Sequence, residues 1–339
     1  MPDGKGIVIS HATLAHPANF QLSFLSYPSG ARVPITNDLT SYDPSGLDVT
    51  ADGKTLATVQ EESSLGVWVM PAEGNATPKA HQLGLAKNQR PYVDWTPDGR
   101  LLTYSGFDYQ LQPLGGRARA TVYTSRLPSF DPAVCGHYLI VPTLDFGKGN
   151  NLVRVNLNDG SKKQLTLGYY AGEPACSPDG QWIAYASNDD GPRQVFKISV
   201  EGGAPQKVSD LNGYRPTFSP DGKLIAFNYT EGETLQSYCL KIPVIPAHGG
   251  TPFYTFETDP RLRSRIHFTP DGKGLAWPLF DGSAGNIWIQ PLAGGAPKQF
   301  TQFSLEGIAD FSFSPDGRTL ALLRGHITKD VVLIKDLNR

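Results

Sequence analysis

Residues 218–227 read Phe218-Ser219-Pro220-Asp221-Gly222-Lys223-Leu224-Ile225-Ala226-Phe227, and this stretch predicts a β-hairpin. Pro220 fixes φ for the first corner of a type I turn, and Asp221 suits the second corner. Gly222 supplies the positive φ of the bulge that returns the chain as an antiparallel strand. The flanking apolar residues, several of them β-branched or aromatic, are typical of buried strands.

The same motif recurs along the whole chain. Its turn glycines are Gly4, Gly53, Gly99, Gly136, Gly180, Gly222, Gly272 and Gly317. Neighbouring copies lie 37 to 50 residues apart, which is about the length of one four-stranded propeller blade. Only the copy at Gly136 is badly worn, because it has lost the aspartate that precedes the glycine in every other copy. The spacing therefore predicts an all-β protein with the β-propeller fold.

Eight motifs favour eight blades, of which the first lacks its first strand and the last lacks its fourth. In the alternative, seven blades close because Arg32 to Asn37 dock beside the final strand. We expect one propeller domain over residues 1–339. Because the chain opens inside the motif, at Met1-Pro2-Asp3-Gly4, we expect this domain to be the C-terminal part of a longer protein.

Composition excludes several classes of function. The chain is 39% hydrophobic and 18% charged, with a formal net charge of −2, so it can build a large core and has no basic footprint for a nucleic acid. No apolar run reaches the roughly 18 residues of a membrane-spanning helix. Because the first residues lack a charged n-region, an apolar h-region and a cleavage site, we do not expect them to act as a signal peptide. We therefore expect no nucleic-acid partner and no direct insertion into a membrane.

The cysteines Cys135, Cys176 and Cys239 lie far apart, without a Cys-x-x-Cys spacing or a nearby histidine pair. An odd and sparse set of cysteines argues against a disulfide framework and against zinc. We interpret all three as small apolar residues buried in strands.

The repeated Ser-Pro-Asp-Gly-Lys/Arg-x-Ile/Leu-Ala-Phe/Tyr pattern resembles the TolB-type WD-like repeat, which implies a β-propeller over nearly the full chain. Segments such as Asn286-Ile287-Trp288 and residues 324–334 also resemble the C-terminal propeller of acidobacterial-type serine/threonine protein kinases. That second resemblance implies a membrane-tethered parent protein whose propeller is a periplasmic or extracytoplasmic sensor. The sequence itself leaves the compartment unknown.

Candidate catalytic patterns are weak. Asp145-Phe146-Gly147 matches the metal-binding triplet of kinases, but the other kinase motifs are missing and the match is a coincidence. Similar propellers accompany prolyl oligopeptidase-type peptidases, whose Gly-x-Ser-x-Gly domain is not in this sequence, or form oligogalacturonate lyases, whose metal is held by clustered histidines. The seven histidines here have no ligand spacing. We expect no metal, no cofactor and no catalytic residue.

The aspartate of each turn belongs to the scaffold, because an Asp before Gly bonds its own backbone and the residue repeats in nearly every unit. The sequons Asn75-Ala76-Thr77 and Asn228-Tyr229-Thr230 matter only in a glycosylating cell.

The loops opposite the turns are the predicted binding face, because they are rich in tyrosine and arginine, the residues that concentrate binding energy at interfaces. The predicted site residues are Arg90, Tyr92, Tyr169, Tyr170, Glu173, Tyr214, Arg215, Arg263 and Arg265.

The predicted function is that of a non-enzymatic β-propeller, a protein-interaction or ligand-sensing module of a signalling protein. We expect a protein or peptide partner, allow a small-molecule ligand, and expect a monomer. The alternative is a propeller enzyme, lyase-like or peptidase-associated, that acts in the central tunnel.

Overall fold

The computed structural model describes residues 1–12, 20–38, 40–73, 81–86, 92–105, 108–115, 120–125, 131–145, 149–230, 241–259, 262, 264–282 and 284–335. These residues form β-strands, turns and loops, and no helix occurs among them. Accordingly, no helix long and apolar enough to cross a membrane is found in the described part of the chain. The all-β class predicted from the sequence is therefore confirmed.

The chain separates into two compact units. Unit 1 contains Met1–Leu65 with Gly325–Arg339, and unit 2 contains Gly66–Ala86 with Arg90–Arg324. Two strands of 17 residues, β5 (Thr55–Pro71) and β27 (Thr319–Lys335), contribute residues to both units. The expectation of a single domain over residues 1–339 stays a prediction.

Unit 1 combines a three-stranded sheet with parts of the long strands. The first sheet has the order β1 (Gly6–Ala12), β2 (Phe20–Ser26) and β3 (Arg32–Pro34), and β4 (Ser41–Val49) pairs with β5. Leu22, Tyr42 and Leu56 form its small buried core. β3 pairs with β2, and the sheet order gives it no pairing with β27 in the described part of the chain, so the seven-blade alternative, which docked Arg32 to Asn37 beside the final strand, is not confirmed.

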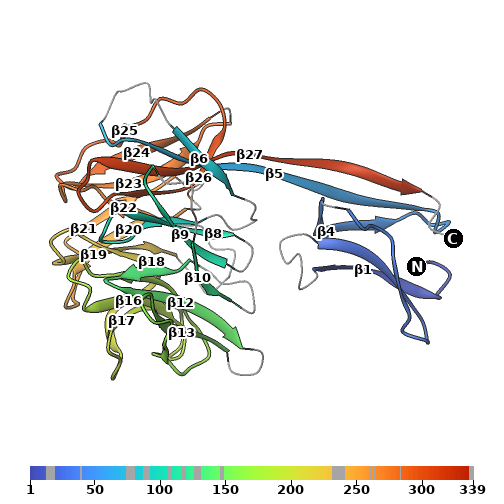
Figure 1. Ribbon diagram of the computed structural model, residues 1–339, viewed down its shortest axis with the longest axis horizontal. Coiled ribbons are helices and arrows are strands. Elements are labelled where there is room, and N and C mark those ends of the chain that lie inside the picture. Colours follow the sequence, from blue (N-terminus) through green and yellow to red (C-terminus); the bar gives the residue numbers. More distant parts are fainter. Residues whose placement is uncertain are drawn as a thin grey trace. The chain divides into compact units, whose positions relative to one another are not determined.

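Unit 2 consists of antiparallel groups of four strands (Figure 1). The first two groups are β7 (Val93–Trp95), β8 (Arg100–Ser105), β9 (Asp108–Pro113) and β10 (Ala120–Thr124), then β11 (Ala133–Cys135), β12 (Tyr138–Asp145), β13 (Gly149–Asn156) and β14 (Lys162–Gln164). Every neighbouring pair within these two groups is antiparallel, as expected for propeller blades.

The next groups share one strand, because the 13-residue β18 pairs with β17 near its start and with β19 near its end. They contain β15 (Ala171–Cys176), β16 (Trp182–Ser187), β17 (Gln194–Ser199) and β18 (Gln206–Phe218), then β19 (Leu224–Tyr229), β20 (Lys241–Pro246) and β21 (Tyr254–Glu257). A fifth group contains β22 (His267–Phe268), β23 (Gly274–Phe280), β24 (Gly285–Pro291) and β25 (Lys298–Gln299).

The last group is built from both ends of the chain. The C-terminal strands β26 (Gly307–Phe313) and β27 pair in order with β5 from the N-terminal part, and β6 (His81–Ala86) pairs with β5. In Figure 1 the red β27 runs beside the blue β5. The last repeat thus takes its third and fourth strands from β5 and β6, whereas the sequence left only its fourth strand missing. Eight blades are not confirmed, because the turns at Gly4 and Gly53 belong to unit 1 and the described sheets of unit 2 carry the other six.

The ends of unit 2 meet through its innermost strands. The backbone N–H of Val93 on β7 donates to Asp310 on β26 over 3.0 Å, and Trp95 Nε1 donates to the carbonyl of Ser312 over 3.1 Å. Ser312 Oγ in turn donates to Asp94 over 2.9 Å. Buried hydrogen bonds of this kind fix the first and last groups of strands against each other, because breaking them would leave unpaired polar atoms in the interior.

The repeated turn has the predicted geometry. Gly222 has φ of 71°, and its N–H donates to the carbonyl of Ser219 over 2.9 Å. The carboxylate of Asp221 accepts from Ser219 Oγ at 2.6 Å and from the N–H of Lys223 at 3.1 Å. The hydroxyl and amide donors lower the pKa of the Asp221 carboxyl. The interpretation of the turn aspartates as scaffold is consistent with these local bonds.

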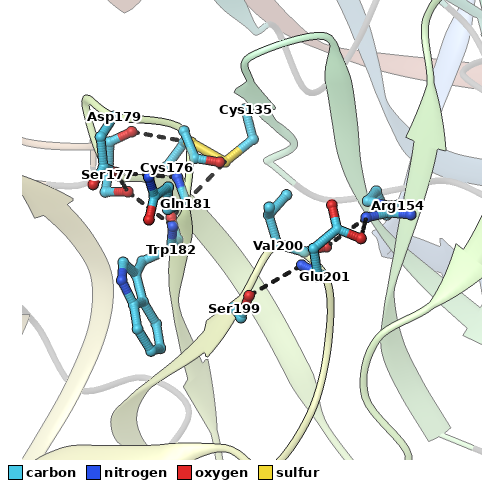
Figure 2. Close-up of a disulfide and its surroundings, with 11 residues drawn as sticks. Cys135, Arg154, Cys176, Ser177, Asp179, Gln181, Trp182, Ser199, Val200 and Glu201 are labelled. Atoms are coloured by element: carbon cyan, nitrogen blue, oxygen red, sulfur yellow. Dashed lines mark hydrogen bonds and ion pairs between the residues drawn. A yellow bond between two sulfur atoms is a disulfide. The ribbon is translucent and has the colours of Figure 1, made fainter.

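The interpretation of the cysteines was wrong for two of the three. Cys135 at the end of β11 and Cys176 at the end of β15 form a disulfide with a Cα–Cα distance of 5.3 Å (Figure 2). It joins the innermost strands of two neighbouring groups, which no local spacing in the sequence indicates. Cys239 lies outside the described residues. Asn228, the first residue of one sequon, is fully buried, so that sequon is closed to glycosylation in the folded chain.

Candidate functional site

One position of the repeat gathers different polar side chains around the middle of unit 2. In five repeats it stands four residues before the Ser or Thr that begins the turn, and in the worn repeat it stands four residues before Cys135. We call these six residues the polar ring: Tyr92, Asp131, Glu173, Arg215, Arg265 and Asp310. Four of them, Asp131, Glu173, Arg215 and Arg265, line a cavity of about 200 Å³. Tyr92 and Asp310 contact Arg265.

Arg265 and Asp310 form a buried bidentate ion pair. Arg265 Nη2 lies 2.7 Å from Asp310 Oδ2, and Arg265 Nε lies 3.3 Å from Oδ1. The guanidinium also lies 4.4 Å from the centroid of the Tyr92 ring, and Nη2 donates to the carbonyl of Val93. Burial alone would lower the pKa of Arg265, but the charge of Asp310 holds it well above its ordinary value. The planar fork of arginine suits this geometry.

Arg215 connects two carboxylates from neighbouring repeats. Its Nε lies 3.3 Å from Asp131 Oδ2, and its backbone N–H donates to Glu173 Oε2 over 3.2 Å. Arg193, on the loop before β17, lies 3.6 Å from Glu173 Oε1. Burial raises the pKa of Glu173, although Arg215 and Arg193 act in the opposite direction. The ring therefore holds a carboxyl group that is less ready to ionise than a surface glutamate.

Two ring residues have a backbone conformation that side chains rarely adopt. Glu173 has φ of 54° and Arg215 has φ of 51°. In both strands the pairing register shifts at this point, between Gly172 and Ala175 and between Tyr214 and Thr217. Such bulges redirect side chains and occur often beside functional sites. The side chains of Glu173 and Arg215 reach the cavity at this bulge.

A second layer of cavity-lining residues lies two positions further along each strand. It contains Asp94, Ala133, Ala175, Thr217 and His267. His267 Nε2 is buried, and no hydrogen-bond partner for it is found among the described residues. Burial, with a smaller effect of the Arg265 charge, lowers the pKa of His267 well below its ordinary value. Its imidazole is therefore neutral at physiological pH.

The structure brings most of the predicted site residues together. Tyr92, Glu173, Arg215 and Arg265 belong to the polar ring. Tyr170 and Tyr214 flank Arg193, whose guanidinium lies 4.9 Å and 5.8 Å from their ring centroids. Tyr169, in the loop before β15, is 77% exposed. Arg90 and Arg263 lie outside the described residues.

The sequence-based prediction missed Asp94, Asp131, Arg193, His267 and Asp310. A search for tyrosine and arginine in the loops between repeats cannot find carboxylates or a histidine, and it misses Arg193 because this residue lies in a loop within a repeat, before β17. The signal that the sequence did offer is the fixed distance to the turn. Asp310 stands four positions before Ser314, which begins the last turn, so this spacing identifies it directly. Asp131 is harder to find, because its repeat has lost the turn motif.

No group of three or more His, Cys, Asp or Glu residues that could hold a metal ion occurs in the described part of the chain. The predicted lack of a cofactor stays a prediction. The ring offers charged groups of both signs, neutral donors and a small cavity, which are the groups that small-molecule sites use to orient a ligand.

Comparison with known proteins supports the fold. No protein-family profile matches the chain. An uncharacterized protein of Agrobacterium fabrum, Atu1656, is 23% identical and covers 81% of each chain. The peptidase YuxL of Bacillus subtilis is 28% identical over 153 residues, which are 44% of this chain and 21% of that protein.

Solved structures are similar to this chain at low sequence identity. A TolB-like protein from Agrobacterium tumefaciens has a TM-score of 0.61 and 18% identity, covering 77% of this chain and 99% of its own. TolB from Acinetobacter baumannii has a TM-score of 0.52 and 14% identity, covering 95% of this chain and 81% of its own. The chain has a TolB-like β-propeller fold. The resemblance to a kinase C-terminal propeller is not shown by these comparisons and stays a prediction.

Proposed function

We propose that this chain is a non-enzymatic β-propeller of six blades that binds a protein or peptide partner at the polar ring. One observation carries the proposal: six repeats place a polar side chain at the same position, on the innermost strand or just before it, and four of these side chains line one cavity. Positions that serve only the scaffold keep the same residue from repeat to repeat, as the turn aspartates do. Variation around a shared cavity is typical of a binding site on a rigid scaffold.

The loop beside the ring has the composition of an interface. Leu167 is 87% exposed and Tyr169 is 77% exposed, and both precede β15, which carries Glu173. Next to Tyr169, the ring of Tyr170 contacts the guanidinium of Arg193. Exposed aromatic and aliphatic side chains next to arginine provide the apolar anchors and polar contacts of protein interfaces. This arrangement supports a protein or peptide partner more than a freely diffusing substrate.

The proposal includes a sensor role in a signalling protein outside the cytoplasm. The disulfide between Cys135 and Cys176 supports an oxidising compartment, where such bonds persist. The resemblance of residues 324–334 to the C-terminal propeller of a membrane-tethered kinase supports the same context.

Site-specific photo-cross-linking in the native organism tests the partner proposal. A benzophenone amino acid replaces Tyr169 beside the ring or, as the control, Phe253, which is 64% exposed and lies with Pro220 and Asp221 on the wall of a different cavity. We expect one discrete protein adduct from position 169 and none from position 253. Equal adducts from both positions, or none from position 169, would contradict the proposal.

A second candidate is a peptidase-associated propeller whose cavity admits a peptide substrate. The local similarity to the peptidase YuxL favours it. A screen of the purified chain with dipeptide and oligogalacturonate substrates, with and without a chelator, separates the two candidates. The binding proposal predicts no turnover, whereas turnover that His267→Ala abolishes would favour the enzyme.

A further inference from the structure

The cavity inside the polar ring contains both carboxylate oxygens and a guanidinium nitrogen that make few or no hydrogen bonds to the described residues. Asp131 Oδ1 has no hydrogen-bond partner among the described residues, and Glu173 Oε1 has only the 3.6 Å ion pair with Arg193. Arg265 uses Nε and Nη2 for Asp310 and Val93, and within the described part of the chain Nη1 has no partner. All three side chains line the same cavity.

A ligand with a single charge does not match this wall. An anion that reaches Arg265 would lie in a small cavity lined by Asp94, Asp131 and Glu173, and the like charges would repel it. A cation that reaches Asp131 would face Arg215 and Arg265. A molecule with a cationic group near the carboxylates and an anionic group near Arg265 would satisfy both ends.

The size and the neutral groups of the cavity restrict the ligand further. Its volume of about 200 Å³ is smaller than the roughly 300–1,000 Å³ of sites for drug-sized ligands. Thr217 and the buried, unpaired Nε2 of His267 add neutral hydrogen-bonding groups to the wall. These features fit a molecule the size of an amino acid or a dipeptide, with a polar middle between two charged ends.

We propose that the cavity binds a small zwitterion, namely a free amino acid or a short peptide, with its ammonium group at Asp131 and Glu173 and its carboxylate at Arg265. The inference rests on the proposed binding role of the same ring and names the ligand class. The zwitterion occupies the cavity inside the ring, whereas the protein partner contacts the outer side of the ring together with the loop of Leu167 and Tyr169.

Three dipeptides that differ only in charge test the proposal by isothermal titration calorimetry. Glycylglycine carries both charges, N-acetylglycylglycine only the negative one, and glycylglycinamide only the positive one. We expect glycylglycine to bind at least about tenfold more tightly than the other two, because each loses a charge-assisted hydrogen bond. Equal affinities for all three, or no heat with glycylglycine, would overturn the proposal.

Two variants and one control locate the binding. Asp131→Asn removes one charge, and Ala175→Leu adds bulk to the cavity wall at a residue that makes no ion pair itself. Asp210→Asn removes an aspartate whose side chain is 91% exposed. We expect the first two to weaken glycylglycine binding at least about tenfold and the third to leave it unchanged. Unchanged binding to Ala175→Leu would overturn the assignment even if Asp131→Asn failed to fold.

Failure of this inference is distinguishable from failure of the proposed function. If glycylglycine does not bind but position 169 still cross-links to a protein, the ligand class is wrong and the partner proposal stands. If glycylglycine binds at the ring and no adduct forms, the zwitterion site stands and the protein partner falls.

Discussion

The turns and the polar ring of unit 2 are separated by only a few residues in each repeat, yet they follow opposite rules. The turns repeat one residue, an aspartate that bonds its own hairpin, as Asp221 does with Ser219 and Lys223. The ring changes from repeat to repeat, through tyrosine, aspartate, glutamate and arginine. The constant positions therefore serve the scaffold, and we propose that the variable positions beside the cavity form the binding site.

The two regions also differ in the range of their bonds. Each turn aspartate bonds residues two positions away, whereas Asp310 binds Arg265, 45 positions away, and Val93, 217 positions away. The turn aspartates are exposed and bond only their own hairpins, while the ring residues are buried or half-buried and join separate repeats. A change in the ring should consequently cost much more stability than a change in a turn.

The largest expected effect is the loss of a ring charge. Arg265→Met leaves Asp310 buried without its partner, and we expect a loss of about 3–5 kcal/mol in the free energy of unfolding. Urea denaturation measures it. Arg100→Met is the matched control, since Arg100 pairs with Asp98 at the turn surface, where their side chains are 42% and 59% exposed, and should cost at most about 1 kcal/mol. Equal losses in the two variants would remove the distinction between the regions.

The disulfide next to the ring should have the second largest effect. Cys135 and Cys176 are 41 residues apart, so closing this loop restricts the unfolded chain by about 3–4 kcal/mol in the chain-entropy account. We expect the Cys135→Ser, Cys176→Ser double variant to lose about 2–4 kcal/mol. A reductant should destabilise the parent chain and leave the double variant unaffected. An unchanged unfolding midpoint for the parent chain would contradict the expectation.

A single turn aspartate should matter less. Asp271 accepts from Thr269 Oγ1 at 2.6 Å and from the N–H of Lys273 at 3.0 Å. Asp271→Ala removes both bonds at the edge of the molecule, and we expect a loss of about 1 kcal/mol with no change in glycylglycine affinity. Thermal denaturation and calorimetry measure the two quantities. A loss as large as that of Arg265→Met would show that the turns are not local scaffold.

The smallest effect concerns pH and has opposite signs in the two regions. Thr269 and the Lys273 amide lower the pKa of Asp271 below 3.8, so its contribution to stability is present above that pH and is lost as the pH falls through the lowered pKa. Burial raises the pKa of Glu173 above 4.5, so its unfavourable contribution grows as the pH rises through the raised pKa. Carboxyl carbon NMR titration should give a midpoint below 3.8 for Asp271 and above 4.5 for Glu173. The reverse order would contradict the burial of the ring.

Local features of the sequence were sufficient to predict the strands, the turns and part of the site. Gly222 adopts the positive φ that its place after Pro-Asp requires, and Glu173 and Arg215 lie at the predicted face because they precede a turn by a fixed distance. Long-range pairing was not predictable. The contact between β27 and β5 joins the two ends of the chain, and the disulfide joins cysteines 41 positions apart. Neither the strand pairing nor the disulfide is indicated by the residues that flank it in the sequence.

The most direct test of the central claim is an NMR titration of the isotope-labelled chain with glycylglycine. The claim is that the variable ring residues bind the zwitterion, whereas the constant turn residues only stabilise the fold. It predicts that the backbone amide signals of Glu173, Arg215 and Arg265 shift along one saturation curve while those of Gly180, Gly222 and Gly272 stay in place. Shifts at the turn glycines, or none at the ring, would contradict it.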